Sequence, residues 1–133
     1  MTSININKEK FGQLIHKEQT VWVDFWAPWC GYCRRIGAAY EKISEEYSDI
    51  LIAGKVNIDE EPQIAEAEKI EIITTLVLYR DGKAIDSIIY NDQLMKSFVK
   101  LNNKQKIVIS RFGRDYLEVG FYIEYIYSKE ILE

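Results

Sequence analysis

Hydrophobic and polar positions alternate along this chain in blocks that predict an ordered series of strands and helices. Strand patterns occupy segments 20–26, 49–59, 74–79 and 84–90, and a short edge strand is expected at 3–6. Apolar residues at helical spacing occupy segments 8–17, 34–47, 62–69 and 93–101. The run from Thr20 to Trp26 is apolar at nearly every position, which is typical of a strand in the middle of a parallel sheet.

The connection between the last two strand segments carries a hairpin signal. Arg80-Asp81-Gly82-Lys83 separates two apolar runs, and Asp-Gly is a preferred pair in two-residue hairpin turns. The element order is therefore β-α-β-α-β-α-β-β-α, a mostly parallel half followed by an antiparallel hairpin and a closing helix. This order predicts an α/β fold, with a central mixed β-sheet and helices on both of its faces.

The sequence Asn102-Asn103-Lys104 marks a predicted boundary between a domain of residues 1–102 and a C-terminal extension of residues 103–133. A chain of 133 residues is one domain with at most a modest appendage. From Tyr116 to Tyr127 the extension alternates apolar and polar positions, and its aromatic and β-branched residues favour a hairpin over a helix. We expect the extension to pack on the domain, on a second copy of the chain or on another partner.

Composition narrows the function classes. The net charge is −4 and there is no basic tract, so nucleic acid is not an expected partner. No apolar stretch approaches the roughly 18–20 residues of a membrane span. The first residues lack the basic and apolar regions of a signal peptide, and two cysteines do not make a secreted disulfide framework. A cytoplasmic location is therefore expected.

The two cysteines, Cys30 and Cys33, are the residues with the clearest chemistry. They follow an apolar strand and precede a helical pattern, so Cys30 is expected at a helix N-terminus and Cys33 close behind it. The positive end of the helix dipole stabilises a thiolate, and such sites lower a thiol pKa from about 8.5 to about 3.5–7.5. The spacing therefore predicts a dithiol that closes to a disulfide and opens again.

Two charged residues stand inside core-like strands. Asp24 lies in the run 20–26, where a buried carboxylate is costly unless it is paired or protonated. Alternation could instead turn it outward, and the same alternative holds for Lys55 in the run 49–59. His16, the only histidine, is expected on or near the surface, because a metal site needs more nitrogen or sulfur ligands than this chain offers.

Several motifs occur together in one order and spacing. They are the run from Asp24 to Cys33, the segment Lys55-Val56-Asn57-Ile58-Asp59 and the Asp-Gly hairpin. Over roughly residues 3–102 the chain resembles thioredoxin. The resemblance implies a thioredoxin fold, and it implies that Cys30 is the exposed attacking thiol and Cys33 the buried resolving thiol. It also implies that Asp24 is a buried aspartate that assists proton transfer at Cys33, with Lys55 beside it.

The resemblance further implies a substrate-binding surface around the cysteines, formed by Trp29, Gly31, Tyr32, Ile73, Thr74 and Tyr90. This surface departs from the family pattern at three positions. Tyr32 replaces the usual proline between the cysteines, so that the motif is similar to that of bacterial periplasmic disulfide isomerases. Thr74 replaces a cis-proline, and Tyr90 replaces a glycine.

The substitution at Thr74 bears on the backbone as well. A cis bond before a residue other than proline costs about 2.5–4 kcal/mol, so the sequence favours a trans or strained bond between Ile73 and Thr74. The threonine hydroxyl is expected to face the thiols. The second helix also has Ala38 where the family has a kinking proline.

These features predict a thiol–disulfide oxidoreductase without a cofactor, most simply a reductase of protein disulfides. The expected partners are disulfide-containing proteins and a reductase or thiol donor. One alternative is an isomerase or oxidase. A second is a redox-linked binding module that uses Tyr90 and the tyrosine-rich extension, and a homodimer formed through the extension is one form of it. A third alternative is a zinc or iron–sulfur site shared between two copies, because each site needs about four ligands.

Overall fold

The structure is a computed structural model that describes residues 3–49 and 51–89. Its elements are β1 (Ile4–Asn5), α1 (Lys8–Ile15), β2 (Thr20–Trp26), α2 (Gly31–Glu46), β3 (Leu51–Asn57), α3 (Pro62–Ala67), β4 (Thr75–Arg80) and β5 (Lys83–Ile89). The order predicted for this part of the chain is confirmed. The helix expected at 93–101, the domain boundary and the extension of residues 103–133 lie outside the described residues and stay predictions.

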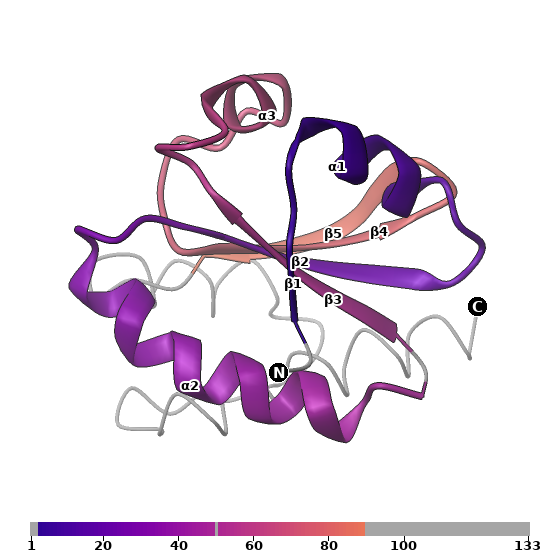
Figure 1. The fold of residues 1–133 in the computed structure, drawn as a ribbon, viewed down its shortest axis with the longest axis horizontal. Coiled ribbons are helices and arrows are strands. Elements are labelled where there is room, and N and C mark those ends of the chain that lie inside the picture. Colours follow the sequence, from indigo (N-terminus) through magenta and orange to yellow (C-terminus); the bar gives the residue numbers. More distant parts are fainter. Residues whose placement is uncertain (1–2, 50, 90–133) are drawn as a thin grey trace, which may run out of the picture.

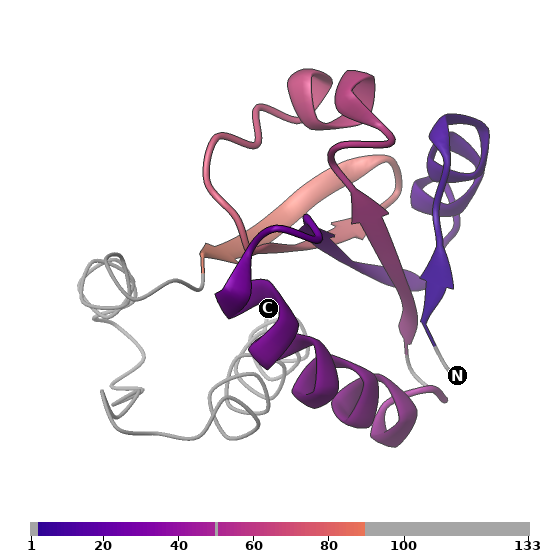
Figure 2. The same cartoon turned by 60° about the vertical axis from the view of Figure 1, so that its left-hand side comes forward.

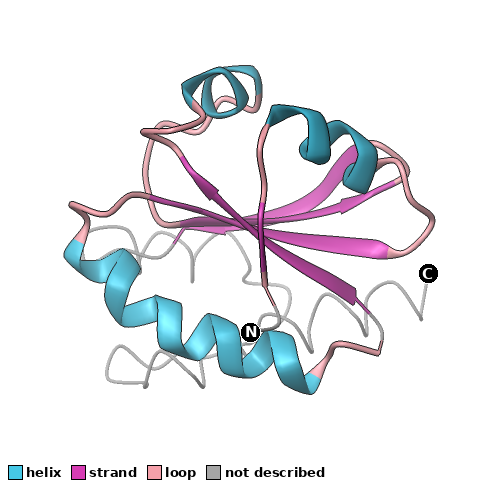
Figure 3. Cartoon of the chain, viewed as in Figure 1, coloured by secondary structure: helices cyan, strands magenta, loops and turns pink. Residues whose placement is uncertain are grey.

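One five-stranded sheet, with the order β1-β3-β2-β4-β5, forms the centre of the described part (Figure 1). Strands β1 and β2 both pair with β3 in parallel, whereas β4 pairs antiparallel with β2 and β5 antiparallel with β4. The predicted mixed sheet is therefore present, and β2 lies at its centre, as its apolar sequence indicates (Figure 3).

The three described helices divide between the two faces of the sheet. Helices α1 and α3 cover one face and α2 covers the other (Figure 1, Figure 2). Alternate residues of β2 serve the two sides. Val21, Val23 and Phe25 belong to a buried cluster on the α1 side. Trp22 belongs to the α2 side, where its ring centroid lies 4.3 Å from that of Tyr40.

Helix α2 begins three residues earlier than the apolar spacing suggested. The predicted segment is 34–47, whereas the helix spans Gly31–Glu46. The reason is a cap that periodicity does not show, because Cys30 is the N-cap and its sulfur accepts a hydrogen bond from the backbone N–H of Cys33. The helix then runs without interruption through Ala38, which keeps the backbone N–H that a proline would lack.

The β4–β5 hairpin has the predicted turn. Asp81 has a φ of 54° and Gly82 a φ of 80°, so both central residues lie in the left-handed region that such turns require. The N–H of Gly82 also donates to the carbonyl of Ile15 across 2.6 Å. This bond ties the hairpin tip to the end of α1.

Candidate active site

Cys30 and Cys33 form a disulfide at the point where the chain leaves β2 and enters α2. Their Cα atoms are 5.2 Å apart. The side chain of Cys30 is half-buried, whereas that of Cys33 is 2% exposed. The N–H of Cys33 lies 3.1 Å from Sγ of Cys30 and donates to it. The more exposed sulfur therefore sits at the positive end of the helix dipole with a direct hydrogen-bond donor.

Asp24 points into the protein and not outward. Its side chain is 1% exposed, and burial raises its pKa from 3.8 to about 7. A hydrogen bond from Thr74 and the charge of Lys55 lower this pKa, and the charge of Glu41 raises it. The carboxyl group is thus poised to bind or release a proton near neutral pH.

Helix α2 presents Cys33 and Tyr40 on one face, because residues seven apart are two helical turns apart. The hydroxyl of Tyr40 lies 2.8 Å from the carbonyl of Trp22 and 2.6 Å from that of Gly54, so it reaches β2 and β3 from the side on which Asp24 lies. Burial raises the pKa of Tyr40 well above its ordinary value, so it stays a neutral donor. Cys33 therefore faces the same side of the sheet as Asp24.

Sequence reasoning did not place Tyr40 or Glu41 beside the site. The seven-residue spacing from Cys33 to Tyr40 is a signal for the first of them. Nothing in the sequence pattern identifies Glu41, whose carboxylate accepts hydrogen bonds from the hydroxyl and the N–H of Ser3.

Lys55 is opposite Asp24 in the register of β3 with β2. Its side chain is half-buried, and its Nζ lies 4.8 Å from the centre of the Trp26 ring. The ammonium is therefore held against the ring face, as a cation–π contact favours. Lys55 and Trp26 line a pocket of about 450 Å³ together with Asn57.

The loop in front of the cysteines exposes a large apolar ring. Trp29 is 66% exposed, and its Nε1 donates to Oδ1 of Asp59 across 3.2 Å. Arg34 donates to the carbonyl of Pro28 across 2.6 Å, which fixes the loop to the first turns of α2. Gly31 is exposed beside Cys30, whereas the side chain of Tyr32 is not described. Asp59, a partner that sequence reasoning missed, ends the motif that starts at Lys55.

The bond between Ile73 and Thr74 is cis, whereas the sequence favoured a trans or strained bond. That expectation weighed only the local cost of the isomer and could not include the contacts of Thr74 in the folded chain. Thr74 is fully buried, and its hydroxyl lies 3.0 Å from Oδ1 of Asp24 and 3.2 Å from the carbonyl oxygen of Phe25. Ile73 is half-buried. Tyr90 lies outside the described residues.

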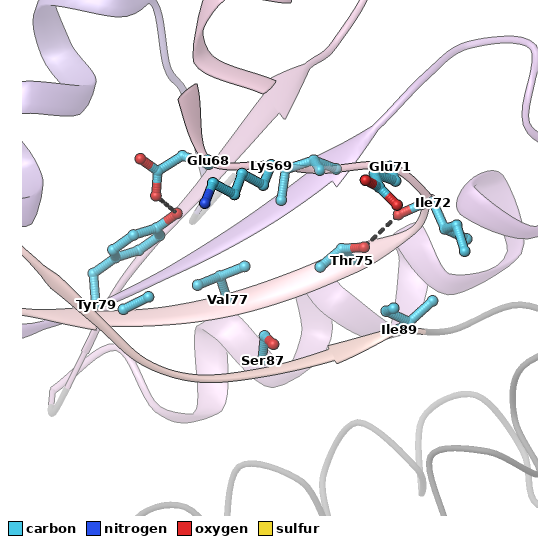
Figure 4. Close-up of a pocket in the computed structure, with 11 residues that line it drawn as sticks. Glu68, Lys69, Glu71, Ile72, Thr75, Val77, Tyr79, Ser87 and Ile89 are labelled. Atoms are coloured by element: carbon cyan, nitrogen blue, oxygen red, sulfur yellow. Dashed lines mark hydrogen bonds between the residues drawn. The ribbon is translucent and has the colours of Figure 1, made fainter. Parts of the chain in front are cut away.

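A second pocket, of about 250 Å³, lies between the α3–β4 connection and the β4–β5 hairpin (Figure 4). Tyr79 donates to Glu68 across 2.7 Å at one end of it, and the hydroxyl of Thr75 donates to the carbonyl of Ile72 at the other. None of the predicted site residues lines this pocket.

Residues 3–49 and 51–89 contain neither a cluster suited to a metal ion nor a membrane-spanning helix. No group of three or more histidine, cysteine, aspartate or glutamate side chains is arranged to hold a metal ion. Likewise, no helix in these ranges is both long and apolar enough to cross a membrane.

Comparisons with known proteins agree with this geometry. The thioredoxin family model matches residues 2–108. Thioredoxin 1 of Synechococcus elongatus is 39% identical over 77 residues, which are 58% of this chain and 72% of that protein. Thioredoxin of Coprinus comatus is 34% identical over 102 residues, which are 75% of this chain and 96% of that protein.

Solved structures show the same similarity. The crystal structure of Malassezia sympodialis thioredoxin has a TM-score of 0.64 at 31% identity, and the match covers 75% of this chain and 91% of that one. Thioredoxin of Plasmodium falciparum has a TM-score of 0.63 at 31% identity, covering 74% and 98%. The chain therefore belongs to the thioredoxin family and has its fold, and it is a dithiol–disulfide oxidoreductase with Cys30 and Cys33 as the redox-active pair.

Proposed function

We propose that this protein reduces disulfide bonds of other proteins in the cytoplasm. The observation that carries the proposal is the asymmetry of the pair, in which Cys30 is half-exposed at the N-cap of α2 and Cys33 is buried behind it. Sγ of Cys30 is accessible to the sulfur of a partner, whereas the buried Sγ of Cys33 is accessible only to Sγ of Cys30. The sequence has no cysteine beyond this pair, which supports a reducing compartment.

In the first step the thiolate of Cys30 attacks one sulfur of a substrate disulfide. A bond forms between the two sulfurs, the substrate disulfide breaks, and the leaving thiolate takes a proton from solvent. The N–H of Cys33 and the dipole of α2 stabilise the thiolate before the attack. The product is a mixed disulfide between Cys30 and the substrate.

In the second step the thiol of Cys33 gives its proton to Asp24, and the resulting thiolate attacks Sγ of Cys30. The mixed disulfide breaks and the second substrate thiolate leaves, so two electrons have passed to the substrate and Cys30 and Cys33 are joined. A pKa near 7 suits Asp24 to this exchange at neutral pH. Lys55, opposite Asp24 in the sheet, favours the ionised carboxylate that accepts the proton.

We assign substrate contact to the surface formed by Trp29, Gly31, Tyr32, Ile73, Thr74 and Tyr90. Exposed Trp29 and Gly31 beside Cys30 support this assignment. Buried Thr74 contributes through its backbone and its bond to Asp24, not through an exposed hydroxyl. As in the thioredoxin family, the partners are disulfide-containing proteins and a reductase or thiol donor that reopens the pair.

The direction of exchange is tested by the reduction potential. Equilibration of the full chain with glutathione buffers, read by the fraction of reduced cysteines, is expected to give a value near the thioredoxin reference of about −270 mV. Reduction of insulin in the presence of a thiol donor is expected alongside. A potential near about −120 mV, the reference for a strong oxidant, would contradict the reductase proposal and favour an oxidase.

A binding role for the extension is a separate proposal. It rests on the alternating aromatic pattern of residues 116–127 in the sequence. Light scattering of the full chain, with turnover measured on the same sample, tests it. A dimer that does not reduce insulin would favour the binding module. A monomer that reduces insulin would support the oxidoreductase activity and contradict the binding role of the extension.

A further inference from the structure

Thr74 holds Asp24 by one of its two carboxyl oxygens. The hydroxyl oxygen of Thr74 lies 3.0 Å from Oδ1 of Asp24 and 3.2 Å from the carbonyl oxygen of Phe25, and Thr74 is fully buried. A hydroxyl has one proton and therefore serves one of these acceptors at a time. An ionised carboxylate is the stronger acceptor, so the proton goes to Asp24 when Asp24 is charged.

The other carboxyl oxygen is left open. Within the described part of the chain, Oδ2 of Asp24 is buried and has no hydrogen-bond partner. A buried carboxylate oxygen without a hydrogen-bond donor is costly while the group is ionised, and taking up a proton removes that cost. The two oxygens thus differ, since one is held and the other is free to receive.

The groups that face Asp24 come from several elements. Helix α2 contributes Tyr40 and Glu41, and β3 contributes Lys55. The loop before β4 contributes Thr74, whose hydrogen bond lowers the pKa of Asp24 more than the charge of Lys55 does. The hydroxyl of Tyr40 donates to the carbonyls of Trp22 and Gly54, so Thr74 supplies the hydrogen bond that the carboxyl group of Asp24 receives.

We propose that Thr74 is a positioning residue for the resolving step. Its hydroxyl fixes Oδ1 of Asp24 and leaves Oδ2 to accept the proton of Cys33. Once Asp24 is protonated, the hydroxyl turns to the carbonyl of Phe25. This inference rests on the proposed role of Asp24 as the proton acceptor. The residue usual at this position in the family, proline, has no hydroxyl to do this. The arrangement is therefore a property of this chain.

Three full-length variants test the proposal. Thr74→Val keeps the shape and removes the hydroxyl, Thr74→Pro removes it with the family's own residue, and Thr74→Ser keeps it. The first readout is the titration of the Asp24 carboxyl carbon by NMR in the oxidised protein. Loss of the hydroxyl is expected to raise the proton affinity of Asp24 about tenfold in the valine and proline variants, and serine is expected to restore it to within about twofold.

The second readout is the decay rate of a mixed disulfide between Cys30 and a small thiol, measured from pH 5 to pH 9. The valine and proline variants are expected to slow this decay and to move its pH midpoint upward with the titration of Asp24, whereas serine follows the parent protein. If valine fails to fold, proline serves as its replacement. An Asp24 titration unchanged in both variants, or shifted equally by serine, would overturn the role of Thr74.

The Asp24→Asn variant separates this inference from the proposed function. If its mixed disulfide decays as fast as that of the parent protein, the role of Asp24 as proton acceptor fails and the inference about catalysis fails with it. If Asp24→Asn is slow and the Thr74 variants are not, only the role of Thr74 is wrong.

Discussion

The backbone N–H of Cys33 donates to Sγ of Cys30 across 3.1 Å, so the buried member of the pair stabilises the exposed one. This bond also caps helix α2, because Cys30 is its N-cap residue. One short segment thereby begins a helix, exposes a sulfur and supplies the donor that a thiolate needs. The helix start and the chemistry at it have the same cause.

Replacement of the buried cysteine should trap partners. In Cys33→Ser the thiolate of Cys30 still forms a mixed disulfide, but the intramolecular attack that resolves it is lost. Because intramolecular attack gains several orders of magnitude from proximity, the lifetime of the mixed disulfide should rise by at least about 100-fold. Non-reducing gels and mass spectrometry of the adducts measure this.

The matched control for trapping is Cys30→Ser. It leaves Cys33, which is 2% exposed, and should form few adducts with protein disulfides. Equal trapping by the two variants would show that both sulfurs reach partners, which contradicts their assigned roles.

Asp24 should make stability depend on pH. Its pKa is about 7 in the folded chain and 3.8 ordinarily, so between these values the folded chain binds more protons at this site than the unfolded chain does. Stability from this group is therefore present at acid pH and falls as the pH rises toward 7. Asp24→Asn should be more stable than the parent protein at pH 8 by roughly 2–4 kcal/mol, with a gap that shrinks toward pH 4.

Urea denaturation of the oxidised proteins at several pH values measures this gap. Asp49→Asn removes a carboxylate that is exposed, and it should show no comparable trend. A stability gap for Asp24→Asn that is the same at pH 4 and pH 8 would mean that its carboxyl group is not held protonated by burial.

Trp29 should matter for protein substrates and little for small ones. Its ring is 66% exposed, so Trp29→Ala should change the free energy of unfolding by less than about 0.5 kcal/mol. Loss of an exposed aromatic contact should lower kcat/KM for insulin by about 5- to 30-fold. The rate with a small aromatic disulfide, which cannot span the same surface, should stay within about twofold of the parent rate.

Trp29→Phe keeps an aromatic ring and removes the donor to Asp59. Its kcat/KM for insulin should therefore lie between those of the parent protein and Trp29→Ala. An equal loss with insulin and with the small disulfide would instead indicate that Trp29 acts on Cys30 itself.

Two glycines should respond oppositely to alanine. A Cβ at Gly37, inside α2, meets no heavy atom within 4 Å, so Gly37→Ala should stabilise the protein by about 0.5–1 kcal/mol. Gly82 has a φ of 80°, and a Cβ there would lie 3.3 Å from the ring of His16, so Gly82→Ala should destabilise it by about 1–2 kcal/mol. Thermal unfolding of both variants gives the comparison, and shifts of the same sign would contradict it.

Much of the fold followed from local pattern. The bounds of β2 were predicted to the residue, and the Asp81-Gly82 turn and the helix start at Pro62 were predicted from residues with strong backbone preferences. The position of the cysteines predicted the start of α2 beside Cys30, although apolar spacing alone indicated residue 34, because a cap formed by a cysteine sulfur leaves no trace in that spacing. The pairing of the cysteines followed from their spacing and from the helix after them.

The sequence by itself determined the order of the elements and the reactive pair, because both depend on residues close together in the chain. The resemblance implied that Asp24 is buried, and the structure confirms it. Only the tertiary structure decided that Asp24 is bonded by Thr74, that Lys55 lies against Trp26 and that the bond before Thr74 is cis. Thr74 and Asp24 are 50 residues apart and meet because β4 pairs with β2 in one register. Contacts of that range arise from the sheet as a whole, and no local pattern of hydrophobic and polar residues encodes them.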